Sequence, residues 1–125
     1  DSTAIINGFT ISGGNANGAA GYPDADQIGG GMLNWQDGSP TVVHCTFEGN
    51  SAQYAGGGMA NGFGSSPTIS DCAFTGNVTA DTLDSGGGGM VNIAESSPEI
   101  TRCSRAESTK AIAATTSMTA ATTPR

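Results

Sequence analysis

Apolar residues return along this chain at fixed offsets within a block of about 27 residues. In each block an aliphatic residue lies two positions after a proline, and a cysteine follows three positions later. In two blocks a phenylalanine lies two positions beyond the cysteine. The Cys-x-Phe alternation places both side chains on one face of an extended strand. The positions concerned are Val42, Ile69 and Ile100, then Cys45, Cys72 and Cys103, then Phe47 and Phe74.

Glycine, asparagine and Ser-Pro occupy equally regular positions between these apolar ones. Gly-Asn follows each phenylalanine, and both residues suit a turn with a positive φ. A Gly-Gly-Gly-Met run precedes each Ser-Pro by the same distance. The runs end at Met32, Met59 and Met90, and the Ser-Pro pairs begin at Ser39, Ser66 and Ser97. The pattern predicts short strands separated by tight corners.

A repeat this short must stack on its neighbours to bury its apolar residues. It has no 3.6-residue periodicity, so we predict an all-β chain, a parallel β-solenoid whose coils stack about 4.8 Å apart. Like residues then form columns of Met, Cys, Val or Ile, and Phe, together with two asparagine columns. The asparagine columns are Asn34, Asn61 and Asn92 in one case and Asn50 and Asn77 in the other. A looser first copy contains Ile6, Phe9 and Ile11, which gives about four coils within residues 1–103.

The repeats resemble those of a known family. Gly-Gly-Gly-Met followed by Phe-x-x-Asn, at Phe47–Asn50 and Phe74–Asn77, is similar to the GGA[ILV] and FxxN repeats of polymorphic outer membrane proteins. More broadly, residues 5–103 resemble right-handed parallel β-helix proteins of the pectin-lyase-like type. The resemblance implies a right-handed helix in a secreted or cell-surface protein, of bacterial origin, and either an adhesive or a polysaccharide-cleaving activity.

The period stops after Cys103. Residues 104–125 are rich in Ala, Thr and Ser and hold three of the four basic residues. We expect an irregular tail or cap; a short helix near Lys110–Ala114, a disordered tail and a shift of reading frame are the alternatives. The chain begins at Asp1 without Met, so we expect it to be a mature product or an excerpt, with adjoining coils of a longer chain.

Charge and cysteine content exclude several classes of protein. The net charge is −7, and residues 1–101 contain no Lys or Arg. Such an acidic body repels phosphate backbones, so we expect no nucleic-acid partner. No segment is apolar and long enough to span a membrane. The three cysteines share one phase of the repeat and match no zinc spacing, which favours a buried column over disulfides.

The repeat is interrupted by two acidic insertions between the Gly-Asn corner and the next glycine run. The first contains Asp24 and Asp26, and the second contains Asp81 and Asp84. Variable loops on a rigid solenoid are where ligands bind. Their carboxylates are candidate Ca²⁺ ligands or sugar contacts; ordinary solvated turn residues are the alternative.

Two aromatic residues are candidates for stacking on sugar rings. Trp35 follows the first glycine run, and Tyr54 lies in the short segment between the acidic insertions. Together with the four aspartates they form the predicted ligand site for a carbohydrate or another surface ligand. No cofactor is predicted beyond the Ca²⁺ considered for the insertions.

One further column has the residue types of acid–base chemistry. His44, Asp71 and Arg102 each precede a cysteine and stack in successive coils. We interpret them as a surface charge ladder. Lyases similar to pectate lyase use a basic proton abstractor with acidic Ca²⁺ ligands, and Arg102 is the only basic candidate in the coils. We therefore predict a non-enzymatic adhesive module, with a polysaccharide lyase or hydrolase as the alternative, and assign no catalytic residue.

Overall fold

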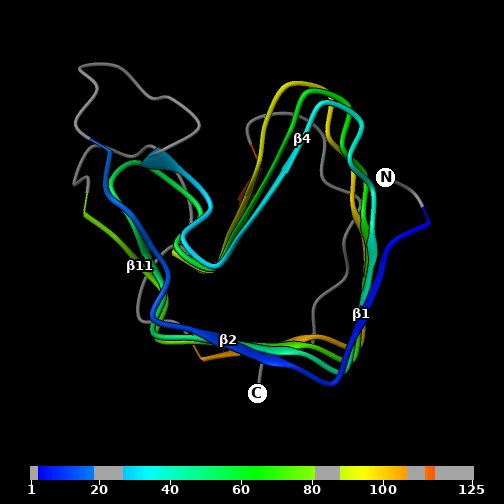
Figure 1. Cartoon of the computed structure of the whole chain (residues 1–125), viewed down its shortest axis with the longest axis horizontal. Helices are drawn as coiled ribbons and strands as arrows, with labels where there is room; N and C mark the ends of the chain where they lie inside the picture. The colour runs from blue at the N-terminus through cyan, green and yellow to red at the C-terminus, as the bar shows by residue number, and fades with distance from the viewer. Residues whose placement is uncertain (1–2, 19–26, 81–87, 107–111, 115–125) are drawn as a thin grey trace.

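The computed structural model describes residues 3–18, 27–80, 88–106 and 112–114. Over these residues the chain is all-β, with no α-helix and with short strands in four parallel sheets. Figure 1 looks along the stack, so the strands of each sheet nearly superimpose, with β1 at the right, β2 along the bottom, β11 at the lower left and β4 above the centre. This arrangement is consistent with a β-solenoid.

Each sheet contains one strand from each successive repeat. The first has the order β1 (Ile5–Asn7), β5 (Thr41–Val43), β9 (Thr68–Ser70), β13 (Glu99–Thr101). The second has the order β2 (Thr10–Ser12), β6 (Thr46–Glu48), β10 (Ala73–Thr75), β14 (Ser104–Ala106). The third has the order β3 (Asn15–Ala16), β7 (Ser51–Ala52), β11 (Val78–Thr79). The fourth has the order β4 (Met32–Trp35), β8 (Met59–Gly62), β12 (Met90–Asn92), β15 (Ile112–Ala114).

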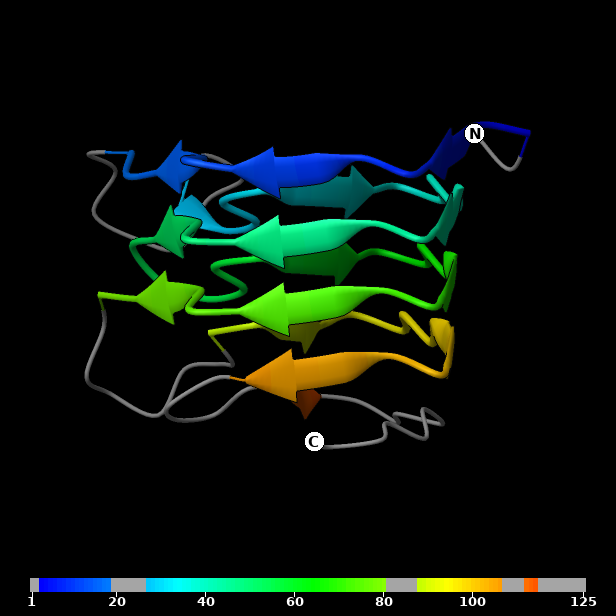
Figure 2. The same cartoon turned by 90° about the horizontal axis from the view of Figure 1, so that it is seen from below.

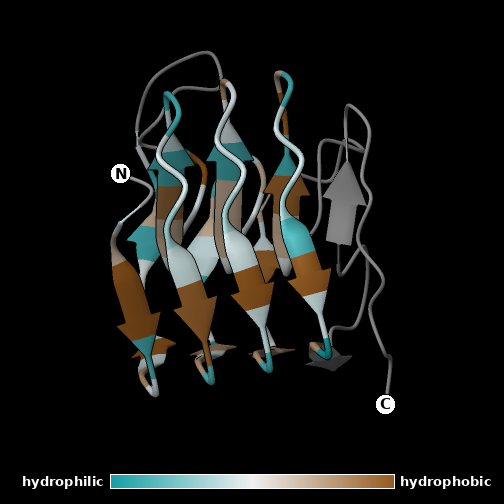
Figure 3. Cartoon of the chain, turned by 90° about the vertical axis from the view of Figure 1, so that its right-hand side faces the viewer, coloured by the Kyte–Doolittle hydropathy of each residue, from teal (hydrophilic) through white to brown (hydrophobic). Residues whose placement is uncertain are grey.

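The register of the sheets places like residues beside one another. Met59 pairs with Met32 and Met90, and Phe47 pairs with Phe74. Figure 2 shows the strands of the second sheet stacked one above another, from β2 in blue to β14 in orange. Figure 3 shows hydrophobic segments aligned across the first sheet. The predicted columns are therefore confirmed, because a parallel in-register pairing repeats the same side chain at the same height.

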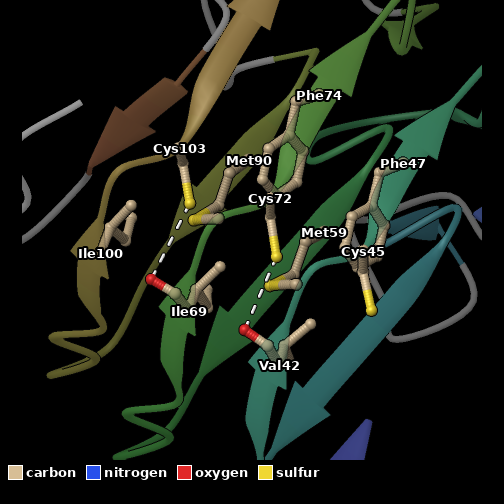
Figure 4. Close-up of a cluster of buried hydrophobic side chains, with 10 residues drawn as sticks. All are labelled: Val42, Cys45, Phe47, Met59, Ile69, Cys72, Phe74, Met90, Ile100 and Cys103. Carbon is tan, nitrogen blue, oxygen red and sulfur yellow. Dashed lines mark hydrogen bonds between the residues drawn. The ribbon is translucent and has the colours of Figure 1, made fainter. Parts of the chain in front are cut away.

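The main core lies inside the stacked sheets. Its members are fully buried, and the rings of Phe47 and Phe74 stack with centroids 4.8 Å apart and planes 4° apart. Figure 4 shows the cysteine, phenylalanine and methionine columns side by side. The core residues are Val42, Cys45, Phe47, Met59, Ile69, Cys72, Phe74, Met90, Ile100 and Cys103. We call this set the inner core.

The three cysteines are buried and free, as the sequence predicts. Each thiol contacts the carbonyl of an aliphatic residue in the preceding repeat; Cys72 Sγ lies 3.5 Å from Val42 O, and Cys103 Sγ lies 3.8 Å from Ile69 O (Figure 4). The neighbouring Cys103 thiol, and next to it burial, raise the pKa of Cys72. The three cysteines are therefore packing residues, because all of them are buried within the inner core.

Two asparagine ladders link successive repeats. Asn34 Nδ2 donates to Asn61 Oδ1, and Asn61 Nδ2 donates to Asn92 Oδ1, both at 2.8 Å. In the second ladder Asn77 Nδ2 donates to Phe47 O at 2.8 Å. The buried amides thus satisfy one another and nearby backbone groups, which is what a buried polar group requires.

Glycine is needed where neighbouring backbones approach closely. A Cβ on Gly57 would lie 2.3 Å from Val78 O and 2.7 Å from Gly88 O. Both atoms belong to the backbone, so no side-chain rotation could relieve the clash. The glycine run before each methionine is therefore a steric requirement of the stacking.

The segment after Cys103 continues the sheets at two places. β14 pairs with β10, with Arg105 opposite Phe74, and β15 pairs with β12. Ile112–Ala114 is thus a strand, and the short helix considered there is wrong over those residues. The disordered tail and the shift of reading frame concern residues outside the described part, and the boundary at residue 103 stays a prediction. Within the described part no helix is long and apolar enough to cross a membrane.

Candidate functional site

A second apolar cluster lies on the other face of the fourth sheet. Along β4, β8 and β12 the methionines lie in the inner core or pack against it, and the asparagines form the first ladder. The alternate residues therefore face outward. The outward residues pack against a segment that precedes each strand, where Ile28 and Ala55 form a parallel β-bridge. The buried members are Ile28, Ala55, Ala60 and Val91, and the partly buried ones are Leu33, Trp35, Tyr54 and Ile93. We call this set the outer cluster.

Both predicted aromatic residues, Trp35 and Tyr54, belong to the outer cluster. They come from different elements: Trp35 is the last residue of β4, and Tyr54 lies in the segment that precedes β8. The backbone N–H of Tyr54 donates to Gln27 O at 2.9 Å, which ties this segment to the preceding repeat. The structure therefore brings these two predicted ligand residues to one side of one sheet.

The indole of Trp35 is seated on a glycine of the neighbouring strand. Gly62 lies opposite Trp35 in the register, and a Cβ there would lie 2.5 Å from Cζ3 of the indole. Phe63 contacts the same ring edge-to-face, with centroids 4.5 Å apart and planes at 68°. Trp35 is half-buried, whereas 52% of Phe63 is exposed. The pair forms an aromatic surface fixed on a rigid sheet.

The turns after β4, β8 and β12 each have two successive residues in the left-handed region. In the first repeat these are Gln36 and Asp37, with φ of 50° and 65°. In the second repeat they are Phe63 and Gly64, with φ of 53° and 80°. These turns lie at the top of Figure 1. A bulky residue such as phenylalanine is a rare occupant of this conformation, and such strain gathers at functional sites.

Asp37 lies in the same corner as Phe63. Its backbone N–H donates to Phe63 O at 3.1 Å, and its carboxylate reaches over the next turn, where a Cβ on Gly64 would lie 2.5 Å from Asp37 Oδ1. Asp37 is exposed. Its carboxylate can accept hydrogen bonds from a ligand that contacts the two rings. We call Trp35, Asp37 and Phe63 the aromatic corner.

Sequence analysis missed Phe63 and Asp37 as site residues. The signal that could have found them is the sequence Met-Leu-Asn-Trp beside Met-Ala-Asn-Gly in aligned repeats, because a large side chain opposite a glycine indicates that the ring covers the next strand. Phe63 between two glycines, at a corner otherwise occupied by Gln36 and Ala94, is the second signal.

The four predicted acidic ligands lie outside the described residues. Asp24 and Asp26 fall within 19–26, and Asp81 and Asp84 fall within 81–87. The Ca²⁺ and sugar contacts expected from these side chains therefore stay predictions. Among the residues that the structure describes, no group of three or more His, Cys, Asp or Glu could hold a metal ion.

His44, Asp71 and Arg102, which each precede a cysteine, form the expected charge ladder. Arg102 donates to both oxygens of Asp71, from Nε to Oδ1 at 2.6 Å and from Nη2 to Oδ2 at 2.7 Å. His44 Nε2 lies 3.8 Å from Asp71 Oδ2, and His44 Nδ1 lies 3.3 Å from Asn7 Oδ1. All three ladder residues have φ near 50°, which turns the chain between the first and second sheets.

The Arg102 hydrogen bond lowers the pKa of Asp71, and in turn Asp71 raises the pKa of Arg102. Asp71 is thus held ionised, and the guanidinium is held protonated. Neither group is poised to exchange a proton near neutral pH, which argues against acid–base catalysis by the Asp71–Arg102 pair.

The chain matches no protein-family model, and no curated protein and no solved structure shows a significant match to it.

Proposed function

We propose that this chain is a structural and adhesive module, without enzymatic activity, of a secreted or cell-surface bacterial protein. The proposed architecture is a right-handed parallel β-helix, similar to the pectin-lyase type, of about four coils in residues 1–103. The in-register parallel sheets support it, because each repeat adds one strand to each sheet in turn. The proposed role is to display side chains that bind glycans or other surface ligands.

The observation that carries this proposal is the joint position of Trp35 and Tyr54 in the outer cluster. The inner face of the fourth sheet is filled by repeated residues, so the sheet is a rigid support. Aromatic rings present a large apolar face at low entropic cost, which suits the C–H face of a sugar ring. Half-buried rings on a rigid sheet are a suitable platform for a carbohydrate.

The charge ladder supports the non-enzymatic proposal over the lyase or hydrolase alternative. Arg102 would be the proton abstractor in such a lyase, but both of its hydrogen bonds to Asp71 keep it protonated. A base must be free to accept a proton at the working pH.

The N-terminal end of the stack supports the proposal that further coils adjoin this one. β1 and β2 lie at the ends of their sheets, and Phe9, which is in line with the buried Cys45, is 62% exposed there. An exposed strand edge is a template for another strand. A version carrying such a coil should bury Phe9 and raise the thermal midpoint; an unchanged midpoint would argue against the idea.

The test is titration calorimetry of the whole chain against a panel of soluble polysaccharides, beside an absorbance assay for unsaturated products of acidic polysaccharides. We expect saturable binding of at least one glycan and no turnover. Clear turnover would establish the lyase alternative, and the absence of binding across the panel would reject the adhesive role. Titration with CaCl₂ tests the aspartates of the insertions: no heat would reject their Ca²⁺ role.

A further inference from the structure

We propose that the aromatic corner, formed by Trp35, Phe63 and Asp37, binds an uncharged glycan through the apolar face of one sugar ring. This inference rests on the proposed glycan-binding function and adds to it a site and a class of ligand. It also adds two residues, Phe63 and Asp37, that the sequence did not single out.

The first argument is that the corner is built to hold the indole in one position. Gly62 leaves the space that the indole occupies, and Ile93 on the following repeat lies close to the same point, since a Cβ on Gly62 would be 3.2 Å from Ile93 Cγ1. Phe63 packs edge-to-face against the indole, with ring centroids 4.5 Å apart. A preorganised aromatic surface loses little entropy on binding, which is where affinity is gained.

The second argument is the conformation of Phe63. Its φ of 53° is unfavourable for a bulky side chain, and 52% of its surface is exposed to water. The aligned positions hold Gln36 and Ala94, so the corner itself does not require an aromatic residue. An exposed ring that carries backbone strain without serving the core fits a binding role.

The third argument concerns the charge of the ligand. Asp37 in the corner and Glu95 in the aligned turn are both exposed, and residues 1–101 carry no Lys or Arg. At these two described turns an anionic sugar would meet like charge, whereas hydroxyl groups of a neutral sugar can donate to the Asp37 carboxylate. The chemistry therefore favours neutral hexose or pentose polymers over uronate or sulfated polymers.

The test uses intrinsic fluorescence, because Trp35 is the single tryptophan of the chain. The probes are the hexasaccharides of glucose, mannose and xylose, with oligogalacturonate as the anionic comparison. We expect a saturable change in Trp35 emission with at least one neutral hexasaccharide and weaker or no change with oligogalacturonate. No change with any neutral probe, or a stronger response to oligogalacturonate, would overturn the proposal.

Phe63→Asn separates binding from folding. Asparagine tolerates a positive φ, so the thermal midpoint should not fall, while loss of the ring should weaken binding about tenfold. Val78→Asn is the matched control, since Val78 is 49% exposed on the third sheet, away from the corner, and its replacement should leave affinity unchanged. Equal affinity in Phe63→Asn and the unmodified chain would overturn the proposal.

Asp37→Asn tests the carboxylate. A charged acceptor forms a stronger hydrogen bond than a neutral one, so affinity for the neutral glycan should fall about fivefold. Unchanged affinity would remove Asp37 from the site. If calorimetry detects glycan binding that neither changes Trp35 emission nor responds to Phe63→Asn, the proposed function stands and this site is wrong. If calorimetry detects no glycan binding, both fail.

Discussion

The two faces of the fourth sheet differ in how much their residue types change from repeat to repeat. On the inner face Met32, Met59 and Met90 repeat in register, and an asparagine follows each two positions later. On the outer face the aligned residues change from repeat to repeat, with Leu33, Ala60 and Val91 in one row and Trp35, Gly62 and Ile93 in the next. Identical neighbours constrain the inner face to one residue type, whereas the outer face can pair a large ring with a glycine.

This difference separates structural residues from candidate functional ones. A residue that returns in every repeat is explained by the stacking, and its chemistry needs no other account. A residue that appears once, such as Trp35 or Phe63, needs a local explanation. Comparing the repeats with one another thus takes the place of comparing related proteins.

The largest expected effect on stability comes from removing a phenylalanine ring from the core, compared with removing one from the surface. Phe74→Ala should lower the free energy of unfolding by about 3–5 kcal/mol, because the ring is fully buried and stacks on Phe47. Phe63→Ala removes the same group from an exposed site and should change it by less than about 1 kcal/mol. Urea unfolding measures both, and equal losses would contradict the assignment of Phe74 to the core and of Phe63 to the surface.

The second largest expected effect on stability is at the glycine run that precedes each methionine. Gly57→Ala should cost about 3 kcal/mol, because the new Cβ would meet the backbone carbonyls of Val78 and Gly88. Gly49→Ala is the control: nothing lies within 4 Å of its Cβ position, so only the strain of its positive φ, about 1 kcal/mol, remains. A loss at Gly57 no larger than the loss at Gly49 would contradict the close approach of the backbones at Gly57.

Ser65 is an exception among the buried polar residues, and its replacement should raise the free energy of unfolding. Ser65 is fully buried, and within the described part its hydroxyl has no hydrogen-bond partner. Ser65→Ala should raise the free energy of unfolding by about 1 kcal/mol, since an unsatisfied buried hydroxyl is destabilising. Ser66→Ala, which removes the acceptor of the Ser97 N–H at 3.2 Å, should lower it by about 0.5–1 kcal/mol. A loss at Ser65 would show that its hydroxyl is satisfied in solution.

The smallest effect concerns the charge ladder on the surface. The lowered pKa of Asp71 means that its pairing with Arg102 stabilises the fold above the pKa of an unfolded aspartate, about 3.9. This stabilisation is lost as the pH falls through the lower pKa of the folded state. The unmodified chain should therefore be slightly more stable than Arg102→Gln at pH 6 and no more stable at pH 2. A difference in urea midpoint that stays constant from pH 6 to pH 2 would exclude a role for Asp71.

Several features of the fold could be predicted because stacking makes them periodic. The columns of Phe47 and Phe74, the buried free cysteines and the pairing of Asp71 with Arg102 all follow from the spacing alone. In-register pairing turns a sequence offset of one repeat into direct contact in space, so aligned positions in the repeats are already neighbours in the fold.

Other features depend on where a segment folds back in space. The outer cluster forms because the segments carrying Ile28 and Ala55 pack against the outward face of the fourth sheet, and those segments do not share the regular strand spacing. The paired left-handed turns were also missed, since Gln36 and Asp37 carry no mark of a positive φ in the sequence. A non-glycine residue adopts that conformation only when the surrounding structure imposes it.

The amino-acid sequence alone specifies the repeat, the all-β class, the inner columns and the ladders, because each depends on interactions between equivalent positions one period apart. The position of Trp35 over Gly62, beside Phe63 and near Asp37, emerges only in the folded chain. That arrangement depends on non-equivalent residues of neighbouring repeats, and the period alone does not specify which ring covers which backbone.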